Sequence, residues 1–264
     1  MDSPALIQSA QDGAVLRLTL NRPGARNALS TGLMAALVDA LDGAAADSSV
    51  RVVIIAAEGP AFCAGHDLKE MTAHRGERDK GAAGFAALFT QCSKLMQQIL
   101  MLPKPVIAEV QGVATAAGCQ LVASCDLAVA SSAAKFATPG VNIGLFCSTP
   151  MVALTRNIGR KAAMEMLLTG EMVSAEDALR LGLINRVVSP DTLAAETMAL
   201  AQTIAAKPRA TVRTGKEAFY RQLEMPRAEA YAYAARIMTE NMLRSDAEEG
   251  IGAFLDKREP KWPE

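Results

Sequence analysis

The chain has 264 residues, a formal net charge of −1 and 50% hydrophobic residues, so it is long enough for one large domain or two smaller ones. Its pI is about 6.2 and only 4% of its residues are aromatic. Such a chain offers neither the basic patch nor the aromatic stacking platforms that nucleic-acid binding requires. No apolar run reaches about 18 residues, so we expect no membrane span.

The five cysteines and two histidines form no recognisable metal or disulfide pattern. The cysteine spacings match neither a disulfide framework nor a zinc site, and neither histidine has a close cysteine or histidine partner. We therefore expect no metal and a reduced, intracellular protein. Because the N-terminus is acidic and lacks a cationic signal region, the expected location is the cytoplasm.

The predicted elements alternate between strands and helices over the first 150 residues. Apolar patterns predict strands over 14–20, 51–57, 106–110 and 126–130. A helix follows Ser30, which is a suitable N-cap, and another runs over 85–102 until Pro103 ends it. The segments over 61–71 and 135–150 are expected to be loops. This alternation predicts an α/β fold with a mostly parallel sheet and right-handed crossovers.

The chain becomes mainly helical after Ala153. Helices are predicted over 154–169 with an interruption near Gly159, and over 191–206, 208–223, 227–244 and 246–258. Ser174 and Asp177 resemble a capping box that opens a further short helix, and Gly182 closes it. We therefore expect a core over residues 1–195 and a helical C-terminal oligomerisation region over residues 196–264.

The stretch from Gln111 to Asp126 is the first candidate site. It follows a predicted strand, contains Gly112 and Gly118, and continues into an apolar helical pattern. A small-residue loop that begins a helix presents unpaired backbone N–H groups and the positive end of the helix dipole, which together favour bound negative charge. A tight turn in a packed core would use the same residues, so the local sequence leaves both interpretations open.

Motifs of several other enzyme classes are missing. The sequence has no G-x-S-x-G, no Walker motif and no G-x-G-x-x-G that opens a helix after a strand. With only two histidines, a Ser-His-Asp hydrolase is poorly supported.

Two segments taken together resemble the crotonase (enoyl-CoA hydratase/isomerase) superfamily. The first is A-F-C-A-G-H-D-L-K-E-M over 61–71, and the second is K-P-V-I-A-E-V-Q-G over 104–112 with G-C and C-D following at 118–119 and 125–126. Similar stretches extend from about residue 12 to 258, and the part over 116–150 is similar to the enoyl-CoA hydratase domain-containing protein 3 type. The resemblance implies a spiral of ββα units followed by a C-terminal helical trimerisation region.

The resemblance also implies how a ligand is held. The family binds acyl-CoA thioesters and stabilises an enolate-like oxyanion with two backbone N–H groups, which by motif position are those of His66 and Ala117. Coenzyme A is then part of the substrate, and no permanently bound cofactor is expected. The residues expected near coenzyme A are Arg26, Ala28, Ala64, Lys69 and Lys257. Arg26 and Lys69 match positions near the phosphates, and Lys257, in the last helix, matches one that reaches a neighbouring subunit. Solvated surface charge is the alternative for all three cations.

The chain departs from family hydratases at both positions where they carry a glutamate. One glutamate follows G-G-G-C and the other lies in F-x-x-P-E, and these positions are Gln120 and Gly140 here. An amide cannot shuttle a proton and glycine has no side chain. Because each acid–base group contributes about 10²–10⁴ in rate, hydration is expected to be severely reduced.

Several residues are candidate substitutes for the missing glutamates. His66 is either an acid–base group or a pocket wall, and Glu109 is either catalytic or part of a buried structural pair. Cys119 and Cys147 are candidate nucleophiles without an evident activating base. Further polar candidates that could orient a water or an acyl group are Asn142, Ser148 and Thr149.

Three functions remain open from the sequence. The first is an acyl-CoA-processing enzyme, nominally an enoyl-CoA hydratase/isomerase, with altered acid–base residues. The second is a non-catalytic acyl-CoA-binding protein. The third is an acyl-CoA hydrolase or decarboxylase that uses the same oxyanion hole. In each case the expected partner is an acyl-CoA molecule, and the expected assembly is a homotrimer or a dimer of trimers.

Overall fold

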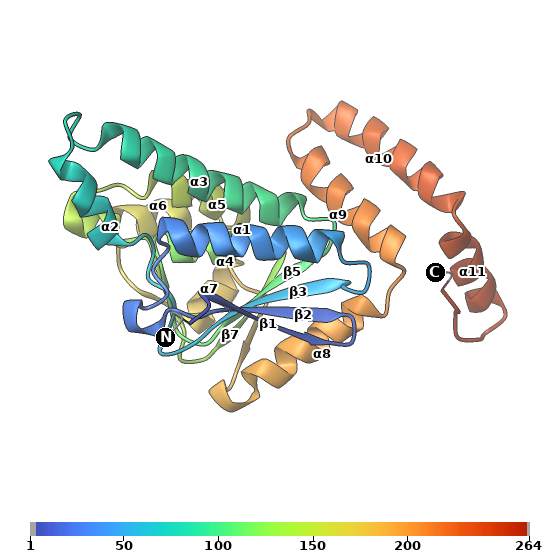
Figure 1. Cartoon of the computed structure of the whole chain (residues 1–264). Helices are drawn as coiled ribbons and strands as arrows, with labels where there is room; N and C mark the ends of the chain where they lie inside the picture. The colour runs from blue at the N-terminus through green and yellow to red at the C-terminus, as the bar shows by residue number, and fades with distance from the viewer. Residues whose placement is uncertain (1–3, 263–264) are drawn as a thin grey trace.

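The computed structural model describes residues 4–262 as an α/β body that carries three helices at its C-terminal end (Figure 1). The main sheet has the strand order β1-β2-β3-β5-β7-β10 and the second sheet has the order β4-β6-β8-β9. The strands of the main sheet are β1 (Ile7–Asp12), β2 (Val15–Leu20), β3 (Val52–Ala57), β5 (Val106–Val110), β7 (Leu127–Ser131) and β10 (Arg186–Val188). Those of the second sheet are β4 (Ala61–Cys63), β6 (Val113–Thr115), β8 (Lys135–Ala137) and β9 (Val173–Ser174).

Neighbouring strands pair in parallel except at one edge of each sheet. In the main sheet only β1 and β2 are antiparallel, and in the second only β8 and β9 are, within the residues that the structure describes. The mostly parallel α/β architecture that the sequence predicts is therefore confirmed.

Most helices begin and end close to the predicted positions, except that α2 was predicted as a loop and α5 begins six residues before the predicted start at residue 154. They are α1 (Thr31–Ala46), α2 (Leu68–Ala73), α3 (Ala82–Met101), α4 (Ala117–Ser124), α5 (Ser148–Asn157), α6 (Arg160–Thr169), α7 (Ala175–Leu181), α8 (Leu193–Ala205), α9 (Arg209–Leu223), α10 (Arg227–Met242) and α11 (Ser245–Leu255). The Ser30 hydroxyl accepts a hydrogen bond from the Leu33 N–H at 3.1 Å, and the Ser174 hydroxyl accepts one from the Asp177 N–H at 3.1 Å. Both predicted N-caps are thus confirmed.

Most of the elements that the sequence did not predict are short, and strand β1 is the exception. Strand β1 is an edge strand whose side chains are mostly exposed, so it lacks the apolar pattern on which strand prediction depends. The predicted loop over 61–71 contains β4 and most of α2, and the predicted loop over 135–150 contains β8 and the start of α5. Three-residue strands are too short to show a periodicity, and their pairing with distant strands is what stabilises them.

The main sheet is covered on both faces. Val53 and Ile55 of β3 point into the core formed with α1 and α3, whereas Val52 and Ile54 pack under α8 with Leu193. The continuous apolar run of β3 follows from this double burial. Helix α8 therefore packs on the sheet, although the predicted division at residue 195 falls within it, and that division stays a prediction. Figure 1 shows α9, α10 and α11 extending beyond the sheet.

A buried ion pair joins α9 to the body. The Lys216 ammonium lies 2.7 Å from the Asp126 carboxylate, and the two side chains are 7% and 15% exposed. Asp126 also accepts hydrogen bonds from the Val106 N–H at 2.6 Å and the Tyr220 hydroxyl at 2.8 Å. Lys216 donates to the carbonyl oxygens of Ile99 at 2.9 Å and Lys104 at 3.0 Å. Since every ammonium proton has an acceptor, this pair anchors the helical extension to the sheet.

Candidate functional site

A cavity of about 520 Å³ opens between the loop after β4, the start of α4 and the segment over 139–150. Its wall consists of Ala64, His66, Leu68, Met71, Phe89, Ala116, Ala117, Pro139, Gly140, Asn142, Ile143, Leu145, Phe146, Cys147, Ser148, Thr149 and Pro150. None of these wall residues is an aspartate, glutamate, lysine or arginine. The cavity therefore suits an apolar group that carries a few hydrogen-bonding atoms.

Two glycines bring the β4 loop against the start of α4. A Cβ added to Gly118 would lie 2.0 Å from the carbonyl oxygen of Cys63, and one added to Gly65 would lie 2.9 Å from the Cβ of Ala116. Gly65 also has φ of +94°, which L side chains rarely adopt. Segments that are about fifty residues apart in the chain thus meet backbone to backbone at one end of the cavity.

Several backbone N–H groups at this contact have no backbone acceptor among the described residues, and those of His66 and Ala117 are the ones that belong to residues of the cavity wall. The Leu29 carbonyl accepts a hydrogen bond from the Asp67 N–H, and the Leu29 N–H donates one to the Gly65 carbonyl. Because successive N–H groups of an extended segment point in opposite directions, the N–H of His66 points away from Leu29. Ala117 is the first residue of α4, where N–H groups have no partner within the helix. Both residues belong to the cavity wall.

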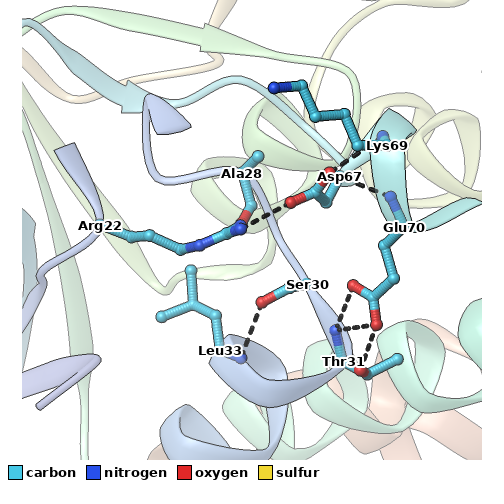
Figure 2. Close-up of polar contacts among 8 residues, drawn as sticks. All are labelled: Arg22, Ala28, Ser30, Thr31, Leu33, Asp67, Lys69 and Glu70. Carbon is cyan, nitrogen blue, oxygen red and sulfur yellow. Dashed lines mark hydrogen bonds and ion pairs between the residues drawn. The ribbon is translucent and has the colours of Figure 1, made fainter. Parts of the chain in front are cut away.

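A polar network fixes the loop that carries His66 (Figure 2). Arg22 forms an ion pair with Asp67 at 2.7 Å, and the Asp67 side chain caps α2 by accepting from the Lys69 and Glu70 N–H groups at 3.0 and 3.2 Å. Glu70 in turn accepts from the Thr31 N–H at 3.0 Å, at the start of α1. These contacts tie Asp67, which directly follows His66, to α2 and through Glu70 to the start of α1, and so they fix the loop that carries His66.

Comparison with known proteins gives the family. The enoyl-CoA hydratase/isomerase family model matches residues 10–264. This chain belongs to the enoyl-CoA hydratase/isomerase family. It is 48% identical to mouse enoyl-CoA hydratase domain-containing protein 3, mitochondrial, over 98% of this chain and 85% of that protein.

Solved structures of the enoyl-CoA hydratase/isomerase family have the same fold. An enoyl-CoA hydratase of Mycobacterium smegmatis is 56% identical, with a TM-score of 0.94 over 98% of this chain and 99% of that one. The human enoyl-CoA hydratase domain-containing protein 3 is 46% identical, with a TM-score of 0.92 over 97% of this chain and 100% of that one. The predicted fold and the predicted similarity to this subgroup are both confirmed.

The predicted cytoplasmic location is contradicted. The names of the similar domain-containing protein 3 sequences from mouse, frog, rat, zebrafish and human all include the word mitochondrial. The prediction was wrong because it used cysteine usage and the acidic N-terminus of this sequence, and neither of these features identifies the compartment. Targeting signals are segments that act independently of the fold, so the composition of the folded part does not identify the compartment.

The two glutamate positions of the family hydratases differ in their surroundings. Gln120 is buried on α4, its side-chain oxygen lies 4.0 Å from the Cys92 sulfur of α3, and it does not belong to the cavity wall. Gly140 does belong to the wall, but a Cβ added there would lie 2.7 Å from the Leu145 carbonyl oxygen and 2.9 Å from the Cys147 sulfur. A side chain at position 140 therefore requires the neighbouring backbone to move.

The His66 imidazole contributes to the wall as a ring that packs edge-on against Phe89, with the ring centroids 5.6 Å apart. Neither ring nitrogen has a hydrogen-bond partner among the described residues, and both atoms are buried. Burial lowers the pKa of His66, so the ring is neutral at pH 7. A wall role agrees with this arrangement, and an acid–base role stays a prediction.

Of the other candidate residues, Asn142, Cys147, Ser148 and Thr149 belong to the cavity wall, whereas Glu109 and Cys119 do not. Glu109 of β5 forms an ion pair with Arg17 of β2, which fits the buried structural pairing. Burial raises the pKa of Cys119 to about 12 and also raises that of Cys147, so neither thiol is a thiolate at neutral pH. The described residues contain no cluster of three or more potential metal ligands and no helix long and apolar enough to cross a bilayer.

Four of the five residues expected near coenzyme A lie together beside the cavity. The Arg26 carbonyl accepts from the Ala64 N–H at 3.1 Å, and the Ala28 carbonyl accepts from Arg22 at 3.1 Å. Figure 2 shows Ala28 and Lys69 close to the Arg22–Asp67 ion pair. Both cationic side chains, of Arg26 and Lys69, belong to exposed residues.

Lys257 lies apart from these four residues. The sequence placed it in the last helix, but α11 ends at Leu255 and Lys257 follows in a left-handed conformation with φ of 54°. Figure 1 shows α11 on the opposite side of the molecule from α2. Any contact of Lys257 with a ligand in this cavity would require a second copy of the chain.

The large apolar side chains of the cavity wall were not identified as site residues from the sequence. Phe89 was predicted only as part of the helix over 85–102, and Leu145 and Phe146 were predicted only as loop residues. Leu145 and Phe146 could have been recognised as an apolar pair within a predicted loop, because exposed side chains in loops are usually polar. In the structure both residues line the cavity and stay 45% and 43% exposed.

Proposed function

We propose that this family member binds an acyl-CoA thioester in the cavity and polarises its carbonyl group with the N–H groups of His66 and Ala117. The observation that supports this most strongly is that two amides without acceptors meet on the wall of a mainly apolar cavity. A thioester oxygen gains negative charge when the α-carbon reacts, and fixed donors stabilise that charge without reorganising. One such donor is typically worth about 10²–10³ in rate.

The reaction that follows polarisation is proposed to be something other than conventional hydration. No carboxylate belongs to the cavity wall, and Gln120 and Gly140 take the positions of the two family glutamates. The same observation supports a second candidate function, an acyl-CoA-binding protein without turnover. Hydrolysis or decarboxylation through the same oxyanion hole is the third, because these reactions need fewer protonating groups on the protein.

We further propose that the chain assembles as a homotrimer or a dimer of trimers through its C-terminal helices. Large apolar side chains are exposed on α9, α10 and α11 and directly after α10, among them Phe254 at 82% and Leu243 at 83%. Such surfaces are costly in water and are typical of contacts between subunits. This assembly would also give Lys257 a route to the cavity of another copy. Sedimentation equilibrium of the full chain tests it, and a monomer at micromolar concentration would contradict it.

Binding of a thioester and its thioether analogue tests the polarising amides directly. Butyryl-CoA and S-butyl-CoA differ only in that the carbonyl group of the first is a methylene group in the second. Each N–H···O hydrogen bond contributes about 0.5–1.5 kcal/mol, so butyryl-CoA is expected to bind about 5–150-fold more tightly in calorimetry. Equal affinities would contradict the oxyanion hole, and no binding of either ligand at micromolar levels would contradict acyl-CoA binding altogether.

A further inference from the structure

Ala116 has a backbone conformation that is unusual for alanine. Its φ is 49° and its ψ is −118°. These angles are those of the first central residue of a type II′ turn, a position dominated by glycine because a Cβ is crowded there. A strained residue of this kind persists only when its surroundings fix the backbone, and such residues concentrate at functional sites.

The surroundings fix Ala116 on both sides. Its N–H donates to the Ala137 carbonyl at 2.9 Å, and its carbonyl accepts from the Gln120 N–H at 3.0 Å. The close approach of Gly118 to Cys63 prevents the start of α4 from turning to relieve the strain. Glycine would meet the same backbone requirements without strain, so the methyl group is all that alanine adds.

That methyl group lies close to the segments that carry the two proposed carbonyl-binding amides. Ala116 belongs to the cavity wall and directly precedes Ala117, the second donor. On the other side, a Cβ added to Gly65 would lie 2.9 Å from the Ala116 Cβ, and Gly65 directly precedes His66, the first donor. The Ala116 methyl group therefore fills the space that the missing side chain of Gly65 leaves open.

We propose that the Ala116 methyl group restricts this site to acyl thioesters that carry no substituent on the α-carbon. The inference rests on the proposed function, because a carbonyl oxygen bound by both amides is what brings the acyl group against this wall. A thioester carbonyl has two neighbours, the sulfur and the α-carbon, and the sulfur is common to all thioesters. A fixed wall beside the carbonyl can thus discriminate between ligands only through the α-carbon, and one methyl group typically changes selectivity by about 10–200-fold.

The Ala116→Gly variant tests this assignment with two acyl-CoA ligands, butyryl-CoA and 2-methylbutyryl-CoA. Wild-type protein is expected to prefer butyryl-CoA by about 10–200-fold in Kd, and Ala116→Gly is expected to reduce that preference at least tenfold. Because the variant also loses a strained residue, its Tm is expected to rise by about 2–4 °C. The rise in Tm reports the strain independently of ligand binding.

A matched control is Ala123→Gly, which removes a buried methyl group from the same helix without touching the cavity wall. It is expected to lower Tm, since glycine is unfavourable within a helix, and to leave the ligand preference unchanged. Equal wild-type affinities for the two ligands, or an unchanged preference in Ala116→Gly, would overturn the inference while leaving acyl-CoA binding intact. A wild-type protein that does not bind butyryl-CoA would overturn the proposed function as well.

Discussion

Hydration of crotonyl-CoA by the purified protein is expected to be at least about 10⁴-fold slower than by a hydratase that has both glutamates. Each acid–base group contributes about 10²–10⁴ in rate, and both are absent here. Since enzymes have a median kcat near 10 s⁻¹, the expected kcat is below about 10⁻³ s⁻¹. The loss of absorbance of the conjugated thioester measures the reaction, with a hydratase carrying both glutamates assayed in parallel. A kcat within about tenfold of that control would contradict the need for the two carboxylates.

Two variants examine why hydration is lost. Gln120→Glu is expected to leave the rate low, because this side chain lies beside Cys92 rather than on the cavity wall. Adding Gly140→Glu is expected to give little further gain, because a Cβ at position 140 would lie 2.7 Å from the backbone oxygen of Leu145. If the double variant hydrates crotonyl-CoA at an ordinary rate, the segment around Leu145 moves easily to accommodate the new side chain. That result would contradict the expected obstruction at position 140.

Replacing Lys216 by methionine is expected to destabilise the protein by about 3–5 kcal/mol in urea-induced unfolding. The substitution leaves the Asp126 carboxylate buried without its counter-ion, and it leaves the Ile99 and Lys104 carbonyl oxygens without their donor. The effect should be seen first in the helical extension, because Lys216 lies on α9.

Two further variants distinguish the loss of stability caused by breaking the buried ion pair from that caused by removing any charged side chain. The double variant Asp126→Asn/Lys216→Met is expected to lose less stability than the two single losses added together, since it removes both charges. Arg156→Met breaks an exposed ion pair with Glu224, at 3.1 Å, and is expected to change stability little. A Lys216→Met protein as stable as Arg156→Met would contradict the anchoring role.

The features that the sequence predicted well are those that local physics determines. Ser30 and Ser174 cap helices through bonds to residues three positions on, and the apolar run of β3 follows from burial on both faces. The short strands β4, β8 and β9 escaped prediction because pairing between distant segments stabilises them. The cavity wall was hard to predict for the same reason, because it combines distant segments between Ala64 and Pro150.

The candidate site was predictable only where the family motif covers it. The motif identified His66 and Ala117, and the structure adds that their N–H groups lack acceptors among the described residues. No sequence pattern shows that Gln120 points toward Cys92, that Gly140 is crowded by Leu145, or that the Ala116 backbone is strained. These properties arise from contacts between segments far apart in the chain.

The carbonyl stretching frequency of a bound thioester is the most direct test of the two amides. Butyryl-CoA labelled with ¹³C at the carbonyl allows the band to be followed by isotope-edited infrared difference spectroscopy on the full chain at saturating protein. Two N–H donors at the oxygen weaken the C=O bond, so the band is expected at a lower frequency in the complex than in water. A bound ligand whose carbonyl band matches that of the free thioester, or lies above it, would contradict the oxyanion hole.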